Sequence, residues 1–278
     1  MPDTNKAQKE FWNGAASTGW VAGQESLDRS LAGVTERLIE RADISSGERV
    51  LDIGCGTGET SLLAAKKVGT TGTVLGVDIS QPMLAHAETR AKAQNLPNVT
   101  FGVGDAQVDD LLKDADLMMS RFGVMFFEDP AAAFSNINKH MTSGGRLCFA
   151  CWQSPKFNDW VSLPVSIARR YVTDEAPRDP LAPGPFALAD DQRIKNILGE
   201  AGWQDVECAP VDFAMPWGDS PENAANGLLE RGPIKPLIAD LPQETIDKIL
   251  AEIAAALPPG ENGISLKGAI WIVTAKAG

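Results

Sequence analysis

The stretch VLDIGCGTG at residues 50–58 constrains the fold of this chain more than any other. A strand-like run leads directly into three glycines at alternate positions, Gly54, Gly56 and Gly58. Glycine accepts positive φ angles and leaves the backbone bare, so a ligand can approach it closely. A helix-like segment at 59–69 follows, and the first turn of a helix offers unpaired N–H groups. The stretch therefore predicts a strand–turn–helix unit whose crevice binds a nucleotide-like ligand.

The rest of the chain repeats this alternation of short apolar runs with amphipathic segments. Near-continuous apolar strands between helices indicate a parallel sheet that is covered on both faces. Asp190 is a suitable N-cap for a helix at 190–201, and Pro210 either weakens the sixth strand or places it at an edge of the sheet. We therefore expect an α/β fold with a doubly wound, mostly parallel sheet and an antiparallel last strand. The predicted strands are 50–54, 73–79, 99–105, 115–122, 146–152, 206–215 and 267–276.

Two segments interrupt the alternation, and both are rich in proline. We expect them to form helical and loop-rich caps on a single domain that spans residues 1–278. The predicted parts are N-terminal lid helices (1–45), a ligand-binding core (46–152), a cap insert (153–186), a continued core (187–215), a second cap (216–265) and the last strand (266–278).

Charge and composition exclude several classes of partner. Acidic residues outnumber basic ones by 37 to 25, which gives a formal charge of −12 and disfavours nucleic acid. The N-terminus lacks the apolar core of a secretory signal, and no apolar run reaches the ~18 residues that a membrane span needs. Four cysteines in a chain of this length are typical of a reducing, cytoplasmic environment. No feature indicates a particular oligomeric state.

The nature of the ligand follows from the residues around the glycines. Asp78 ends the second predicted strand, 24 residues after Gly54, where a carboxylate can accept hydrogen bonds from both ribose hydroxyls. A dinucleotide site needs G-x-G-x-x-G, but here the third glycine arrives one position early. Glu59 and Asp52 would also face a pyrophosphate. A nucleoside that carries positive charge fits these surroundings better.

The motifs, taken together, resemble those of the class I S-adenosylmethionine-dependent methyltransferases. VLDIGCGTGETS is similar to their glycine-rich motif, and LGVDIS to their second-strand acidic motif. GDAQ, DLMMSRFGVMFFEDP and GGRLCFACW resemble the motifs at the next three strands. The resemblance covers residues 46–152 and is strongest to the small-molecule branch that contains the ubiquinone and menaquinone methylases. It implies a Rossmann-like fold and S-adenosyl-L-methionine as cofactor.

The resemblance also implies roles for individual residues. The glycines and Cys55 would lie beneath the methionine moiety, and Asp52 would order its amino group. Asp78 would bind the ribose. The adenine would pack on Ile79 and Met83 and contact Asp105 and Ala106, and Arg121 and Phe122 would border the transferring methyl. Met83 and Ile79 are equally typical of core packing, and Arg121 of an ion pair with Asp116 or Glu128. The cofactor-binding set is Asp52, Gly54, Cys55, Gly56, Gly58, Asp78, Ile79, Met83, Asp105, Ala106, Arg121 and Phe122.

Methyl transfer from a sulfonium is an in-line displacement that needs alignment and exclusion of water more than acid–base groups. Candidates for contact with a small-molecule acceptor are Asn158 and Asp159, after the fifth strand, and Tyr171, the sole tyrosine. Tryptophans in the predicted caps could line an apolar pocket or simply fasten the caps to the core. These are Trp12, Trp20, Trp160 and Trp217.

The remaining titratable residues do not indicate further chemistry. Cys148 and Cys151 have metal-site spacing but point to opposite faces of a strand, so we expect no metal. His86 and His140 fall on predicted outer helices and are expected to be solvated. A nicotinamide-dependent oxidoreductase and a non-catalytic ligand-binding protein of the same fold stay open as alternatives to a methyltransferase.

Overall fold

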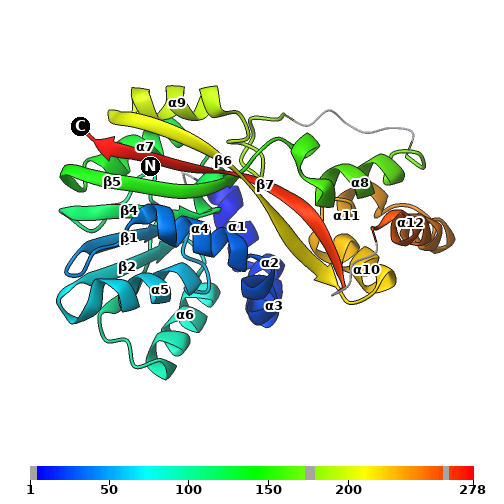
Figure 1. Cartoon of the computed structure of the whole chain (residues 1–278), viewed down its shortest axis with the longest axis horizontal. Helices are drawn as coiled ribbons and strands as arrows, with labels where there is room; N and C mark the ends of the chain where they lie inside the picture. Colours follow the sequence, from blue (N-terminus) through cyan, green and yellow to red (C-terminus); the bar gives the residue numbers. More distant parts are fainter. Residues whose placement is uncertain (1–4, 173–178, 259–262) are drawn as a thin grey trace. The chain divides into compact units, whose positions relative to one another are not determined.

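The computed structural model describes residues 5–172, 179–258 and 263–278. Its strands form one seven-stranded sheet with the order β3-β2-β1-β4-β5-β7-β6. Figure 1 shows β2, β1, β4 and β5 side by side in that order. Strands β3, β2, β1, β4 and β5 pair in parallel, and β7 is antiparallel to its neighbours. The predicted fold class is therefore confirmed. The strands are β1 (Arg49–Ile53), β2 (Thr73–Asp78), β3 (Val99–Val103), β4 (Ala115–Arg121), β5 (Met141–Trp152), β6 (Trp203–Gly218) and β7 (Ile264–Ala277).

The chain divides into two compact units. Unit 1 comprises residues 1–152, 181–210 and 271–278, and unit 2 comprises 153–180 and 211–270. The segments expected to form the two caps fall mostly in unit 2, and their covering role stays a prediction.

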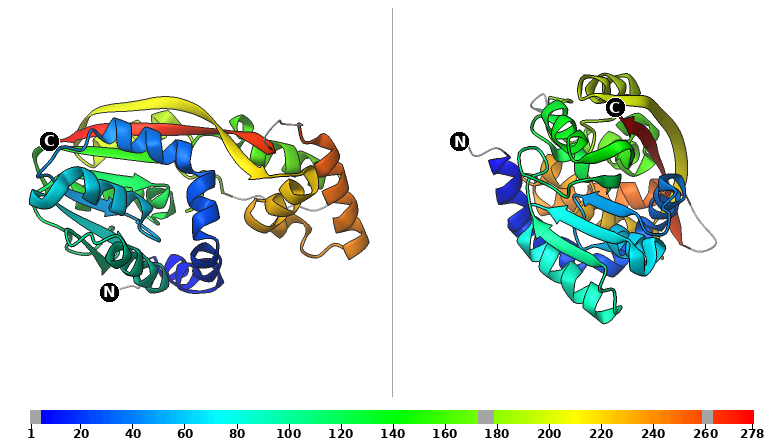
Figure 2. Two further views of the ribbon diagram at one scale, coloured as in Figure 1. Left: turned by 60° about the horizontal axis from the view of Figure 1, so that its bottom comes forward. Right: turned by 90° about the vertical axis from the view of Figure 1, so that its left-hand side faces the viewer.

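Unit 1 holds the parallel strands and places helices on both of their faces (Figure 2). Helix α4 packs on β4 and β5, whereas α5 packs on β1 and β2. The core of unit 1 is apolar because its strands are buried on both faces of the sheet. Phe134, Phe149 and Met118 are fully enclosed there. The helices of unit 1 are α1 (Lys6–Asn13), α2 (Ala15–Ala22), α3 (Gln24–Ser30), α4 (Ala32–Ala42), α5 (Glu59–Val68), α6 (Gln81–Ala93), α7 (Pro130–Asn138) and α9 (Asp191–Glu200).

Two predictions from individual residues, Asp190 and Pro210, agree with the structure. The Asp190 carboxylate accepts from the backbone N–H of Arg193 at 2.7 Å and so caps α9. Strand β6 lies at one edge of the sheet, the position that strands containing proline usually take. Both β6 and β7 are longer than predicted, and Trp217 therefore lies within β6 and not outside the strands.

Unit 2 is more helical than its proline content indicates. The segment predicted as loop-rich contains α8 (Asp159–Ala168), which accommodates Pro164. The second segment contributes α10 (Pro221–Arg231), α11 (Lys235–Ile238) and α12 (Gln243–Ala256). None of the described helices combines the length and the apolar character that crossing a bilayer requires.

Candidate cofactor site

The three glycines of the turn are required for different structural reasons. All three have positive φ angles, 64°, 54° and 86° for Gly54, Gly56 and Gly58. A β-carbon on Gly54 would lie 2.6 Å from the Cα of Gly123, and one on Gly58 would lie 2.8 Å from the Cβ of Ala87. At Gly56 the nearest such neighbour is the sulfur of Met83, at 3.9 Å. The protein's own packing therefore excludes side chains at two positions, whereas the backbone at Gly56 is bare toward open space.

Asp52 lies beneath this turn as a fully enclosed carboxyl group. Its Oδ2 accepts from the hydroxyls of Thr60 at 2.7 Å and Ser61 at 2.5 Å, in the first turn of α5. Its Oδ1 is buried and has no hydrogen-bond partner among the described residues. Burial raises the pKa of Asp52 to about 6, although the two hydroxyls and the Arg121 guanidinium oppose this shift. A buried carboxylate oxygen without a partner is a candidate acceptor for a cationic hydrogen-bond donor.

Asp78 joins the glycine turn to the end of β2. Its two oxygens accept from the backbone N–H groups of Gly56 and Ser80, each at 2.8 Å. Burial raises the pKa of Asp78, and these backbone donors oppose the shift. Ser80 directly precedes α6, where serine often caps a helix, but its hydroxyl donates to the carbonyl of Trp12 at 2.6 Å and does not cap α6.

Asp105 and Ala106 follow β3 and are both buried. The Asp105 carboxylate accepts from the side-chain amide of Asn5 at 2.8 and 2.9 Å, so the N-terminal segment reaches this part of the site. The Ala106 carbonyl accepts from Asn136 at 3.0 Å. The half-buried Ile79 precedes α6, and its carbonyl accepts from Asn13 at 2.9 Å.

Met83 and Cys55 are apolar neighbours of the turn. Met83 is buried on α6 with its sulfur toward Gly56. Cys55 is buried, and a β-carbon on Gly76 of β2 would lie 2.9 Å from its sulfur. Burial and the nearby carboxylates raise the pKa of the Cys55 thiol well above its ordinary value, so the thiol stays protonated.

Arg121 and Phe122 end β4 beside the first glycine. The Arg121 guanidinium donates to the Thr35 hydroxyl at 2.7 Å and lies 3.4 Å from the Asp28 carboxylate. The alternative ion pairs with Asp116 or Glu128 are therefore not formed. Phe122 has a φ of 68°, which is rare for a bulky residue, and its ring stacks on Trp152 at 4.4 Å. Such backbone strain is typical of functional sites.

Helix α3 anchors the N-terminal segment through Asp28. One Asp28 oxygen faces Arg121, and the other is 3.0 Å from Arg90, which also donates to the carbonyl of Thr57 at 2.8 Å. Arg90 pairs with Glu59 at 2.5 Å. These four charged side chains are 25% exposed or less, so the network holds α3, α6 and the glycine turn together. Trp12 packs edge-on against Trp20 and against Phe126, at 6.1 and 5.2 Å.

The other acceptor candidates belong to unit 2. Asn158 is fully buried: its amide donates to the carbonyls of Gln153, Ser154 and Ala269 and accepts from Ala269 N–H and Trp160 Nε1. Trp160 stacks on Trp217 at 6.1 Å. The indole nitrogen of Trp217 is buried with no partner among the described residues, and Arg231 lies over its ring at 5.3 Å.

Asp159 and Tyr171 differ in their surroundings. Asp159 is exposed in the first turn of α8. The Tyr171 hydroxyl donates to Glu252, and this contact raises the pKa of the tyrosine.

The two histidines, both expected to be solvated on outer helices, differ in their surroundings. His86 is half-buried on α6, with its Nε2 3.3 Å from the side-chain oxygen of Gln24. His140 is buried and contacts the Asn136 carbonyl at 2.8 Å and Asp110 at 2.8 Å. It lies just beyond the end of α7, and its ring links the last turn of α7 to the segment between β3 and β4. The expected solvation of His140 is therefore wrong.

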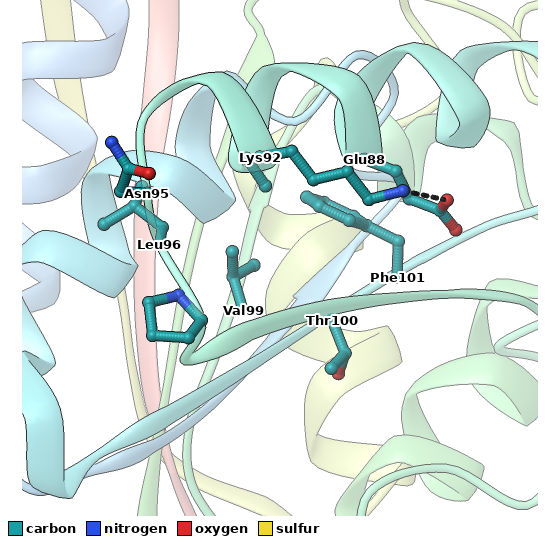
Figure 3. A pocket seen from close by; sticks show the side chains of 9 residues that line it. Glu88, Lys92, Asn95, Leu96, Val99, Thr100 and Phe101 are labelled. Atoms are coloured by element: carbon teal, nitrogen blue, oxygen red, sulfur yellow. Dashed lines mark ion pairs between the residues drawn. The ribbon is translucent and has the colours of Figure 1, made fainter.

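A hollow of about 650 Å³ lies elsewhere, between α6 and β3 (Figure 3). Lys92 and Glu88 are paired at 4.0 Å on α6 at this hollow, which Val99 and Phe101 of β3 also line. It is at the amino end of β3, whereas Asp105 follows the carboxyl end. The hollow is therefore separate from the cofactor site.

Sequence reasoning missed three residues of the site. Gly123 was part of a recognised motif, but its contact with Gly54 depends on strand pairing. Asn5 and Asp28 lie in the N-terminal segment, where no motif or periodicity distinguishes them from ordinary polar residues.

Comparison with known proteins is consistent with this geometry. A family model described as a methyltransferase domain matches residues 44–177. Aklanonic acid methyltransferase DauC of Streptomyces sp. (strain C5) is 37% identical over 122 residues, which cover 44% of this chain and 54% of DauC. Demethylmenaquinone methyltransferase of Staphylococcus saprophyticus is 26% identical over 184 residues, which cover 62% of this chain and 77% of that enzyme.

The fold is also shared with solved structures. Haemonchus contortus phosphoethanolamine N-methyltransferase 2, solved in complex with S-adenosyl-L-methionine, aligns with a TM-score of 0.52 and 20% identity. The alignment covers 87% of this chain and 52% of that one. The chain spans about half the length of DauC, the relative with the higher identity of the two described. From the motifs, the fold and these matches we conclude that the chain carries a methyltransferase domain over residues 44–177.

Proposed function

We propose that this chain transfers the methyl group of S-adenosylmethionine to a small-molecule acceptor. The observation that carries the proposal is the bare backbone at Gly56, whose N–H donates to the buried Asp78 carboxylate, with the buried Asp52 on the strand that leads into the same turn. Both relatives described above are named as methyltransferases of small organic compounds, which supports the same class of acceptor here.

The residues present fit this cofactor. The unpaired Oδ1 of Asp52 would accept from the amino group of the methionine moiety, which carries positive charge. Asp78 would bind the ribose hydroxyls, with Ile79 and Met83 beside the adenine and Asp105 on its amino group. Negative charge around the turn also favours a sulfonium over a pyrophosphate. When bound, the cofactor supplies an activated methyl group.

The protein's part in the reaction is alignment and exclusion of water. Methyl transfer from a sulfonium needs donor and acceptor at near-contact distance in one line. The ring of Phe122, which follows β4, stacks on Trp152, and the methyl group would lie beside this pair. A base is required only for an acceptor that carries a proton at the reaction pH.

The acceptor contacts stay proposals. We assign Trp12 and Trp20 to acceptor contact because they form an aromatic cluster with Phe126, just beyond Phe122. Trp160 and Trp217 are the candidates in unit 2, where the unpaired indole nitrogen of Trp217 offers a donor. Asp159 and Tyr171 are the candidates for a polar contact. A cytoplasmic location also stays a proposal, supported by four free cysteines.

Isothermal titration with S-adenosylhomocysteine tests the cofactor site. We expect micromolar binding to the intact chain and a loss of at least about 100-fold in Asp78→Ala, because two ribose hydrogen bonds to a charged group disappear. Asp212→Ala is the control, since Asp212 is exposed on β6 and pairs with Lys267. Absence of binding to the intact chain would refute the proposal, and quenching of fluorescence by NAD would favour an oxidoreductase.

Activity separates the enzyme from a non-catalytic binder. The intact chain, incubated with radiolabelled S-adenosylmethionine and a panel of phenols, amines, thiols and quinones, is expected to label at least one acceptor. Tight cofactor binding without label transfer across the panel would favour a ligand-binding role for the same fold.

A further inference from the structure

The adenine end of the proposed site is occupied by the protein itself. The side-chain nitrogen of Asn5 donates to both oxygens of Asp105, at 2.8 and 2.9 Å. Asp105 is the residue proposed to accept from the amino group of adenine. A side-chain amide and the adenine amino group are both flat NH₂ donors. Asn5 therefore makes the hydrogen bond that the ligand would make.

The Asp105 carboxylate has little capacity for a further partner. Besides Asn5 it accepts from the backbone N–H of Gln107 at 3.1 Å, and the Lys9 ammonium lies 3.4 Å away. Asp105 is 3% exposed and Asn5 is 5% exposed. An adenine amino group could reach these oxygens only if the Asn5 amide moved away.

Asn5 is held in this position by more than Asp105. Its backbone N–H donates to the Glu128 carboxylate at 2.9 Å, and its side-chain oxygen accepts from the Glu128 N–H at 3.0 Å. Asn5 has a φ of 57°, a left-handed conformation that asparagine adopts more readily than most residues. The residue is therefore fastened to the loop after β4 as well as to the loop after β3.

Helix α1 continues from Asn5 to the loop after β2. At its far end, the Trp12 carbonyl accepts from the Ser80 hydroxyl, and Asn13 bridges the Ile79 carbonyl and the Gln81 N–H at 2.9 and 3.0 Å. One short helix thus connects the two loops that follow β2 and β3, and these loops hold the proposed ribose and adenine contacts.

We propose that Asn5 is an internal substitute for the adenine amino group, so that the N-terminal segment closes its own adenine site. The inference rests on the proposed function, because it needs Asp105 to be an adenine contact. Cofactor binding then requires Asn5 to leave Asp105, and the apparent affinity is lowered by the fraction of molecules in the closed state. Removing the Asn5 amide should make the cofactor bind more tightly.

The test is titration of S-adenosylhomocysteine into the full chain and three variants. Asn5→Ala removes the competing amide, and we expect its affinity to rise about 10-fold, as for a site closed nine-tenths of the time. Glu128→Ala leaves Asp105 unchanged but removes the acceptor of the Asn5 N–H, so a smaller rise is expected. Lys6→Ala is the matched control on the same helix, because Lys6 is 65% exposed and pairs only weakly with Glu10.

Hydrogen exchange gives a second readout that does not depend on affinity. Amides of residues 6–13 are expected to exchange faster when S-adenosylhomocysteine is bound, because α1 loses its contact at Asp105. Unchanged or weaker binding in both Asn5→Ala and Glu128→Ala would overturn the inference and leave the proposed function intact. Absence of binding in every variant would instead refute the proposed function, and this inference with it.

Discussion

Gly54 and Gly123 touch backbone to backbone. A β-carbon on Gly54 would lie 2.6 Å from the Cα of Gly123, and one on Gly123 would lie 2.7 Å from the Cα of Gly54. The turn after β1 and the turn after β4 are therefore pressed together. Strands β1 and β4 are adjacent and parallel, so their ends meet at the same edge of the sheet. This contact sets the spacing between the glycine turn and Phe122.

Gly123→Ala is expected to destabilise the protein and to weaken cofactor binding. The added methyl group would also lie 2.8 Å from the Ile53 carbonyl oxygen, so the two turns must separate. Overpacking of this kind costs about 1–3 kcal/mol of unfolding free energy. Chemical denaturation and titration with S-adenosylhomocysteine measure the two effects. Gly102→Ala is the control, because its methyl group would meet Leu75 at an ordinary 3.8 Å. Equal stability of both variants would contradict the packing argument.

Asp52 should make stability depend on pH in a direction opposite to that of most carboxylates. Its folded-state pKa of about 6 lies above the ordinary aspartate pKa of 3.8, so the folded protein holds the proton more tightly than the unfolded chain. The stabilisation is complete below the unfolded pKa and is lost as pH rises from about 4 to 6. Its upper limit is about 3 kcal/mol at roughly 1.4 kcal/mol per pH unit.

The pH effect can be isolated with Asp52→Asn, which stays neutral at every pH. The difference in unfolding free energy between this variant and the intact chain is expected to shift in favour of the variant between pH 4 and 6 and to be constant above pH 7. Glu25→Gln is the control for the loss of one charge, since Glu25 is 84% exposed. A difference that is constant over the whole range would show that Asp52 is not buried as described. The same variant is expected to bind S-adenosylhomocysteine more weakly.

Asp28 is expected to contribute more to the free energy of unfolding than an ordinary surface carboxylate does. It is 14% exposed and faces two guanidinium groups, Arg90 and Arg121, that are themselves 15% and 10% exposed. Asp28→Ala leaves both cations without this partner, and such a loss costs about 3 kcal/mol in buried pairs. Glu25→Ala on the same helix is expected to change stability by less than about 0.5 kcal/mol, because its pair with Arg29 is exposed. Similar effects for the two variants in denaturation curves would contradict the network.

The fold was predictable because its signals are local. The glycine turn, the Asp190 cap and the edge position indicated by Pro210 each depend on a few neighbouring residues, and each was correct. The motifs at the ends of the first strands were recognisable for the same reason. They identified Asp52, Asp78 and Asp105 as residues of one candidate site before any strand pairing was known.

The contacts that complete the site depend on long-range packing and could not be predicted. Asn5 and Asp105 are 100 positions apart, and Arg121 and Asp28 are 93 apart. Arg121 had nearer acidic residues in the sequence, yet its partner comes from α3. His140 was expected on an outer helix, but α7 ends before it and its ring is buried between α7 and the segment that precedes β4. Such pairings follow from the fold and not from local composition.

Asn158 and Asp159 are adjacent, and their variants should separate a structural role from a functional one. Asn158 is buried and makes five hydrogen bonds, two of which join the start of α8 to Ala269 of β7, so Asn158→Ala is expected to cost about 2–4 kcal/mol. Asp159 is exposed, and its effect on α8 is limited to the helix dipole, at most about 1 kcal/mol. If Asp159 contacts the acceptor, Asp159→Ala lowers kcat/KM at least about 10-fold in the labelling assay while S-adenosylhomocysteine affinity is unchanged. A normal kcat/KM in this variant would remove Asp159 from the acceptor site and leave Tyr171 as the polar candidate in unit 2.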